Sequence, residues 1–175
     1  RRHEVDRVNT LLVDPDVRVL TLTGPGGTGK TRLAIEAAAE SSDAFPDGLW
    51  WVPLASLTDP GLALSAVAKA TSVDEGPDGV LASDLAARLA SGRSLVLLDN
   101  AEHLLPLLAV ELAPVVREAK GATFLVTSRA ALHLDAEREF QVPAMTPDDA
   151  ELFVTSKAAA IGVELEPSSA LSTLC

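Results

Sequence analysis

The segment from residue 24 to residue 31 is the part of the sequence best suited to chemistry. It contains Gly-Pro-Gly-Gly-Thr-Gly-Lys-Thr and fits the pattern G-x-x-x-x-G-K-S/T. Phosphate oxygens need several backbone N–H donors that converge on one point, and glycines permit the positive φ angles of such a loop. The lysine would place an ammonium group against the β- and γ-phosphates of a nucleoside triphosphate, and the last threonine would offer a hydroxyl to Mg²⁺. The phosphate-binding residues expected here are Gly24, Pro25, Gly26, Gly27, Thr28, Gly29, Lys30, Thr31 and Arg32.

A single carboxylate follows an apolar run further along the chain. Residues 95–98 are Leu-Val-Leu-Leu, and Asp99 comes directly after them. A site that binds a triphosphate needs a carboxylate at the end of a neighbouring strand to hold the Mg²⁺ shell. We therefore expect Asp99 to bind Mg²⁺ together with Thr31. The alternative is a strand-end aspartate that caps the following helix.

An arginine follows the next predicted strand, in the sequence Thr127-Ser128-Arg129. A cation that reaches the γ-phosphate from this edge could sense that group, or could neutralise charge that develops in the transition state. Arg129 is therefore a candidate catalytic residue, together with Lys30 and Asp99. A solvated loop arginine is the alternative.

Strands and helices are predicted to alternate along the chain. Apolar and β-branched runs predict the strands, and apolar residues at helical spacing predict the helices. The strands are expected at 17–23, 49–54, 94–99, 123–127 and, as a short fifth strand, 139–142. The helices are expected at 4–13, 31–40, 60–71, 79–91, 103–119 and 147–161. This order is typical of an α/β protein whose parallel sheet is covered by helices on both faces.

Prolines and tryptophans refine this prediction. Pro106 is expected in the first turn of its helix, and Pro114 is expected to kink the middle of the same helix. Trp50 and Trp51 are adjacent on a predicted strand, so their side chains should face opposite sides of the sheet. We expect both tryptophans to pack in the core.

The composition limits the partners that this chain can have. Its 175 residues, 47% hydrophobic and 22% charged, are typical of one globular domain. A net charge of −11 without a Lys/Arg cluster argues against direct binding of nucleic acid by this segment. The one cysteine, Cys175, allows no disulfide within the chain, and no apolar run approaches the ~18 residues that span a bilayer. We therefore expect a cytoplasmic protein.

These motifs, in this order, resemble the STAND class of P-loop ATPases. More narrowly, the chain is similar to the NB-ARC-type nucleotide-binding domain of large bacterial transcriptional regulators of the LuxR type and of antibiotic pathways. The stretches that carry the resemblance are 21–27, 45–50, 57–60, 98–104 and 127–129. The stretch 98–104, Leu-Asp-Asn-Ala-Glu-His-Leu, is considerably more specific than the glycine-rich segment alone.

The resemblance implies a three-layer P-loop NTPase fold of the ASCE type, with about five mostly parallel strands. It implies that Arg129 contacts the γ-phosphate, that Asp99 holds Mg²⁺, and that residues 1–5 belong to the family's opening motif, whose start packs near the adenine. Residues 1–145 would form the nucleotide-binding domain, and 146–175 would lead into a helical domain beyond the last residue. ADP would hold the family's switch closed, and ATP would open it and drive self-association or the release of partner domains.

One position departs from the pattern of rapidly hydrolysing P-loop enzymes. Many of them carry an acid directly after the Mg²⁺-binding aspartate, whereas this chain has Asn100. An amide cannot take a proton, so slow hydrolysis of ATP is expected. Glu102 is the nearest candidate for a general base, or else an ordinary acid at a helix start. Two other functions stay open: an ATPase of fast turnover that uses Glu102 as its base, and a nucleotide-binding scaffold that neither hydrolyses nor switches.

Overall fold

The helices and strands alternate in the order that the sequence predicts. The computed structural model describes residues 1–74, 81–144 and 155. The strands are β1 (Val19–Thr23), β2 (Leu49–Pro53), β3 (Ser94–Asp99), β4 (Ala122–Thr127) and β5 (Glu137–Gln141). The α-helices are α1 (Arg2–Val13), α2 (Lys30–Glu40), α3 (Ala63–Thr71), α4 (Leu81–Ala90) and α5 (Leu107–Glu118), and the short 3-10 helices are η1 (Ser42–Ala44) and η2 (Pro60–Leu62). The predicted helix at 147–161 lies outside the described residues apart from Thr155.

The chain divides into two units. The larger unit, Arg2–Val142, contains all the helices and strands named above. The smaller unit consists of Arg1 and Pro143–Cys175, and within it the Arg1 guanidinium donates a hydrogen bond of 3.1 Å to the Pro143 carbonyl. The predicted division between 1–145 and 146–175 stays a prediction. No helix in the described part of the chain has both the length and the apolar character that crossing a bilayer requires.

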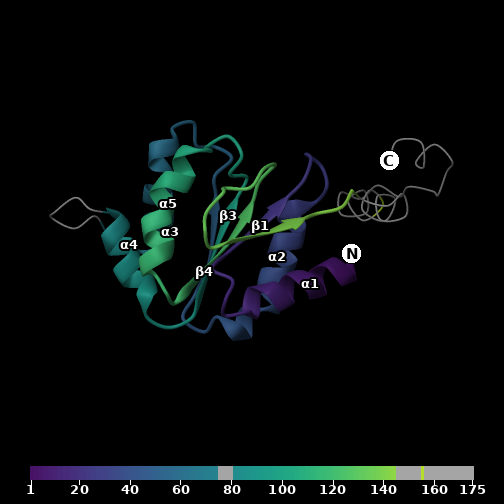
Figure 1. Ribbon diagram of the computed structural model, residues 1–175, viewed down its shortest axis with the longest axis horizontal. Helices are drawn as coiled ribbons and strands as arrows, with labels where there is room; N and C mark the ends of the chain where they lie inside the picture. The colour runs from purple at the N-terminus through teal and green to yellow at the C-terminus, as the bar shows by residue number, and fades with distance from the viewer. Residues whose placement is uncertain (75–80, 145–154, 156–175) are drawn as a thin grey trace. The chain divides into compact units, whose positions relative to one another are not determined.

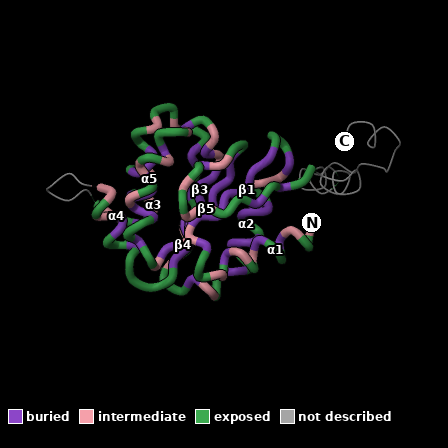
Figure 2. The backbone as a smooth tube through the Cα atoms, in the orientation of Figure 1, coloured by how far each residue is buried: buried purple, intermediate pink, exposed green. Residues whose placement is uncertain are grey.

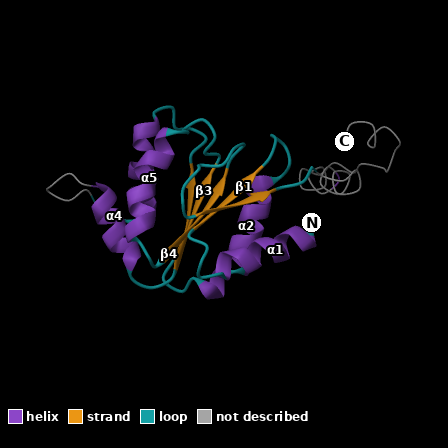
Figure 3. Cartoon of the chain, viewed as in Figure 1, coloured by secondary structure: helices purple, strands orange, loops and turns teal. Residues whose placement is uncertain are grey.

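Five strands form one sheet in the order β2-β3-β4-β1-β5, and every neighbouring pair is parallel. The interior strands β1, β3 and β4 are buried along almost their whole length. Their continuous apolar runs are explained by this burial, because both faces of each strand are covered. The parallel arrangement places the carboxyl ends of the three interior strands at the same edge of the sheet (Figure 3). The predicted α/β fold with a parallel sheet is confirmed.

Helices cover the two faces of the sheet. Helices α1 and α2 pack on one face, and α3, α4 and α5 pack on the other (Figure 1). Successive residues of β3 alternate between the two cores: Leu95 and Leu97 pack with α1 and α2, whereas Val96 and Leu98 pack with the other three helices. Buried residues accordingly follow the strands through the middle of the larger unit (Figure 2). The sheet is thereby fixed between two apolar layers.

Helix α5 is shorter than the sequence predicts. The prediction begins at residue 103, but residues 102–106 form turns and the helix begins at Leu107. Pro106 therefore lies at the N-cap instead of in the first turn, while Pro114 lies inside the helix as expected. A proline has no N–H to donate, so the first positions of a helix tolerate it far better than the interior does.

The prediction that both tryptophans pack in the core is wrong for Trp51, which is 52% exposed. Trp50 packs against the core beneath α3 and α4, and the Arg88 guanidinium carbon lies 5.3 Å from the centroid of its ring. The difference arises because β2 is an edge strand, whereas α2 packs on the interior strands β1, β3 and β4. The side of β2 that carries Trp51 is therefore poorly covered.

The edge of the sheet at the amino ends of the strands is tightly packed around Gly121. A Cβ atom at this position would lie 2.4 Å from the carbonyl oxygen of Gly92 and 2.9 Å from that of Ala90. The Arg18 guanidinium secures the same edge, because it donates hydrogen bonds to the carbonyl oxygens of residues 116, 119 and 122 around the end of α5. Backbone atoms, which cannot move aside like a flexible side chain, thus surround Gly121.

The substitution Gly121→Ala is expected to lower the free energy of unfolding by about 2 kcal/mol, because the added methyl group overpacks rigid backbone. Urea denaturation followed by circular dichroism measures this change. Gly26→Ala is the matched control, since a Cβ at Gly26 meets no atom within 4 Å and should change the same free energy by less than ~1 kcal/mol. Equal losses in the two variants would contradict the packing explanation.

Candidate functional site

The candidate site lies where the interior strands end. Strand β1 ends at Thr23, the glycine-rich loop follows, and α2 begins at Lys30. The parallel register places Leu22 of β1 opposite Thr127 of β4, and Leu98 of β3 opposite Val126. The loop, Asp99 and the end of β4 are therefore brought to one edge of the sheet, which is the usual ligand-binding edge of open α/β folds.

The loop has the backbone conformation that its glycines predict. Gly27 and Gly29 have φ angles of 83° and 81°, which residues with side chains rarely adopt. The Thr28 hydroxyl donates a 3.0 Å hydrogen bond to the Pro25 carbonyl and closes the turn. A Cβ at Gly26 or Gly27 would meet nothing within 4 Å, so the loop has open space beside its backbone. This is the space that a phosphate group needs if it is to contact backbone N–H groups.

Lys30 lies folded over this loop. Its Nζ atom donates hydrogen bonds to the carbonyl oxygens of Gly24 (2.8 Å) and Pro25 (2.9 Å). Burial lowers the pKa of Lys30, and the Glu102 and Asp99 carboxylates oppose this effect while the Arg129 guanidinium adds to it. Lys30 therefore lies within the electrostatic reach of three other charged residues that the sequence proposes for the site, namely Asp99, Glu102 and Arg129.

Asp99 is held by two threonine hydroxyls. Asp99 is only 8% exposed, and its Oδ1 atom accepts hydrogen bonds from Thr31 Oγ1 (2.7 Å) and Thr127 Oγ1 (2.6 Å). A carboxylate as buried as this needs such donors, because burying an unpaired charge is unfavourable. The predicted pair of Thr31 and Asp99 is thus brought together although the two residues are 68 positions apart in the sequence.

Thr127 is a site residue that sequence reasoning missed. Besides donating to Asp99, its hydroxyl accepts a 2.9 Å hydrogen bond from the backbone N–H of Asn100. Asn100 has a φ of 66°, a left-handed conformation that asparagine tolerates better than most residues. The backbone is further tied by the Ala101 N–H, which donates to the Thr127 carbonyl. The only sequence signal was a threonine at a strand end beside the predicted arginine.

Glu102 and Arg129 form an ion pair at the same edge. The Arg129 Nε atom lies 3.0 Å from Glu102 Oε1. The side chain of Glu102 is 18% exposed and that of Arg129 is 68% exposed. The second carboxylate oxygen of Glu102, Oε2, is buried and has no hydrogen-bond partner among the described residues. Neither the sequence spacing nor the motif pattern predicted this contact.

His103 connects two of the stretches that carry the family resemblance. Its Nε2 atom lies 2.8 Å from the Leu57 carbonyl oxygen, so the turn after β3 is joined to the loop after β2. Arg32, the remaining predicted site residue, is exposed in the first turn of α2.

The donors present suit a magnesium ion. Mg²⁺ prefers oxygen ligands and is usually held by one or two protein groups together with substrate phosphates and water. The Thr31 hydroxyl and the Asp99 carboxylate supply two such oxygens beside the open loop. The part of the chain that the structure describes contains no cluster of three or more His, Cys, Asp or Glu residues that could hold a metal alone. Phosphate oxygens would therefore have to complete the coordination.

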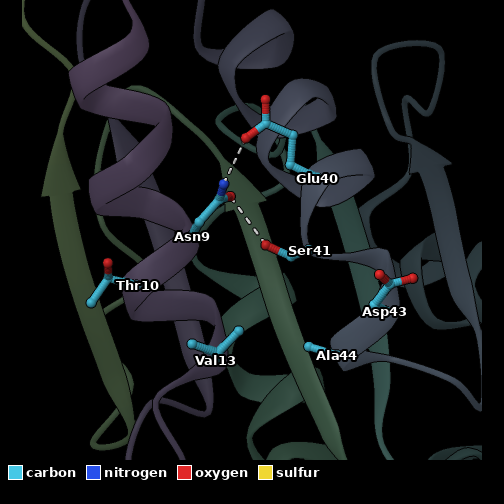
Figure 4. Close-up of a pocket in the computed structure, with 7 residues that line it drawn as sticks. All are labelled: Asn9, Thr10, Val13, Glu40, Ser41, Asp43 and Ala44. Carbon is cyan, nitrogen blue, oxygen red and sulfur yellow. Dashed lines mark hydrogen bonds between the residues drawn. The ribbon is translucent and has the colours of Figure 1, made fainter.

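A pocket of about 360 Å³ lies between α1 and the end of α2, away from this site. Figure 4 shows that its central polar groups already bind one another. Asn9 donates to Glu40 (3.0 Å) and accepts from the Ser41 hydroxyl (3.1 Å). This pocket is best explained by the packing of the two helices, and it presents no feature of a phosphate site.

The fold resembles that of two solved proteins from archaea. The crystal structure of Cdc6p from Pyrobaculum aerophilum has a TM-score of 0.69 at 17% sequence identity, and the match covers 91% of this chain and 49% of that one. The STAND protein with a tetratricopeptide repeat sensor from Pyrococcus horikoshii has a TM-score of 0.54 at 16% identity, over 99% of this chain and 27% of that one. These likenesses show the P-loop NTPase fold that the sequence predicts.

Two bacterial proteins are similar in sequence. A Mycobacterium tuberculosis protein assigned as an HTH-type transcriptional regulator is 36% identical over 138 residues, which are 78% of this chain and 15% of that protein. The regulatory protein AfsR of Streptomyces coelicolor is 30% identical over 168 residues, with 89% of this chain and 16% of that protein covered. The chain therefore spans less than a fifth of the length of either relative.

The family itself is shown by a match to the NB-ARC domain over residues 1–162. Since this match covers most of the chain, and the predicted motifs lie within it, the chain belongs to the NB-ARC family of nucleotide-binding domains.

Proposed function

We propose that this chain is an ATP- and ADP-binding switch domain with slow, Mg²⁺-dependent ATP hydrolysis. The observation that carries the proposal is the Thr31–Asp99 hydrogen bond of 2.7 Å beside an open glycine-rich loop. A hydroxyl, a carboxylate and a lysine are thereby combined at the positive end of α2, where phosphates bind favourably. Membership of the NB-ARC family supports nucleotide as the ligand.

Each site residue has a role in this proposal. The nine residues from Gly24 to Arg32 surround the phosphates, and Lys30 leaves the loop carbonyls to bind the β- and γ-phosphates. Thr31 and Asp99 hold Mg²⁺, which would neutralise charge on the phosphates when bound. Arg129 turns from Glu102 toward the γ-phosphate and so responds to its presence.

Slow hydrolysis is supported by the groups that follow Asp99. Asn100 cannot accept a proton from water. Glu102 could accept one, but its Oε1 atom is engaged by Arg129. A general base must be free to reach the proton of the attacking water, and this carboxylate is partly occupied.

A fast ATPase is the second candidate function. The buried Oε2 atom of Glu102 favours it, because this oxygen has no partner among the described residues and could receive a proton. The third possibility, a scaffold that binds nucleotide without hydrolysing it, rests on no specific contact in the structure.

The wider role that we propose is in transcriptional or other signalling. The regulators similar in sequence are several times longer than this chain, so the domain would act on other parts of a larger protein, or through self-association when ATP binds. The acidic charge of the chain supports no direct contact of this domain with nucleic acid. A cytoplasmic location remains part of the same proposal.

Lys30→Ala is expected to weaken ATP binding by roughly 100-fold, because the phosphates lose their main cationic partner. Isothermal titration calorimetry with MgATP measures the dissociation constant. Lys69→Ala is the matched control, since Lys69 is an exposed lysine on α3 and should leave the constant unchanged. Unaltered affinity in Lys30→Ala would sink the assignment of the phosphate site.

The turnover number for ATP is expected to lie below ~1 s⁻¹, which is slow for an enzyme. Release of inorganic phosphate under saturating MgATP measures it. A wild-type turnover number well above this limit, together with a loss of turnover in Glu102→Gln, would favour the fast ATPase. No turnover, together with equal protease sensitivity in ATP and ADP, would favour the scaffold.

Thr127→Val is expected to weaken the Mg²⁺ dependence of ATP binding about tenfold, because the Asp99 carboxylate loses a donor that orients it. The measurement is the ratio of ATP affinities with Mg²⁺ and with EDTA. Thr127→Ser retains the hydroxyl and should restore the ratio. If valine and serine gave the same ratio as wild type, the orienting role of Thr127 would be wrong.

A further inference from the structure

Four charged side chains lie at the proposed phosphate site: those of Lys30, Asp99, Glu102 and Arg129. A bound triphosphate would need Lys30 and Arg129 as its own partners, but in the structure both bind protein groups. Lys30 is held on two loop carbonyls, and Arg129 is held on Glu102. Asp99 is bound by hydroxyls and has no basic partner among the described ion pairs. Both cations that the phosphates need are therefore engaged by protein groups.

The two engagements differ in strength. Lys30 is bound to neutral carbonyls, which any phosphate outcompetes, because an anion is a stronger acceptor for an ammonium group. Arg129, whose side chain is 68% exposed, is bound to the carboxylate of Glu102, whose side chain is only 18% exposed, so its release separates two opposite charges at a partly desolvated position. The lysine is thus released more easily than the arginine.

The two nucleotides therefore differ in what they must displace. In the proposed site, the β-phosphate of ADP would bind at the glycine-rich loop and would need Lys30 alone. The γ-phosphate of ATP would also recruit Arg129, which follows β4 at the same edge of the sheet. We propose that Glu102 is a specificity-determining residue that lowers the affinity for ATP relative to ADP by competing with the γ-phosphate for Arg129. This inference rests on the proposed function of the site.

The geometry of Glu102 strengthens the competition. When Arg129 leaves, the carboxylate remains beside the triphosphate with its Oε2 atom buried and without a donor among the described residues. An unpaired and largely buried negative charge next to a polyanion is unfavourable. Glu102 thus weakens the binding of the γ-phosphate in two ways: its carboxylate binds Arg129, and its negative charge repels the phosphate.

The test is to replace Glu102 by glutamine, which keeps the shape and the acceptor oxygen but removes the charge. Calorimetry with the 175-residue chain measures dissociation constants for MgADP and for the magnesium complex of the β,γ-imido analogue of ATP. Glu102→Gln is expected to bind the ATP analogue about three- to fivefold more tightly, the size typical of a partly exposed ion pair, and to bind ADP within twofold of wild type.

Two further variants make the result specific. In the Arg129→Ala background, glutamine at position 102 is expected to have a smaller effect on ATP-analogue affinity, because no arginine remains to be contested. Glu40→Gln is the matched control: Glu40 pairs with Arg2 at 2.6 Å at the far end of α2, and its loss should change neither dissociation constant.

An unchanged ratio of the two affinities in Glu102→Gln would overturn the inference. So would a weaker affinity for the ATP analogue, or a loss of turnover without any change in the ratio, since that pattern belongs to a general base. If wild type bound neither nucleotide, or if Lys30→Ala bound both like wild type, the proposed function would itself fail and the inference with it. These outcomes are distinct from an unchanged ratio in a protein that binds both.

Discussion

The candidate site depends on the two hydrogen bonds that the Asp99 carboxylate accepts from Thr31 and Thr127. They connect the first turn of α2, the end of β3 and the end of β4, which are three segments with no sequence proximity. A buried carboxylate is tolerated only where donors satisfy it, so the three segments stabilise one another. The same Thr127 hydroxyl also fixes the backbone at Asn100, where the chain turns away from the strand with a positive φ.

The apolar layers make this arrangement possible. Because β3 has helices on both faces, its side chains pack alternately into two apolar cores, and the close packing of those cores fixes its register with β4. The fixed register holds the strand ends level with the glycine-rich loop. The positions of the polar site residues at the edge of the sheet therefore depend on the packing of the apolar core within it.

The proposal of a slowly hydrolysing switch rests on the charged and polar groups around the loop. Lys30 and Arg129 both have protein partners, and the position after Asp99 is an amide. In the proposed switch, the γ-phosphate changes the pairing of Arg129 from Glu102 to the nucleotide. A small rearrangement of this kind is the local event that a larger regulator could amplify.

The sequence by itself determined the phosphate loop, the strand-borne Asp99, the alternation of strands and helices, and the resemblance to the NB-ARC family that the comparisons confirm. These features are local, since each depends on residue types within a few positions. Only the tertiary structure decided that Thr127 binds Asp99, that Glu102 binds Arg129, and that Trp51 is exposed on an edge strand. Such contacts depend on strand order and register, which arise from packing between segments distant in sequence. No short sequence pattern predicts these contacts.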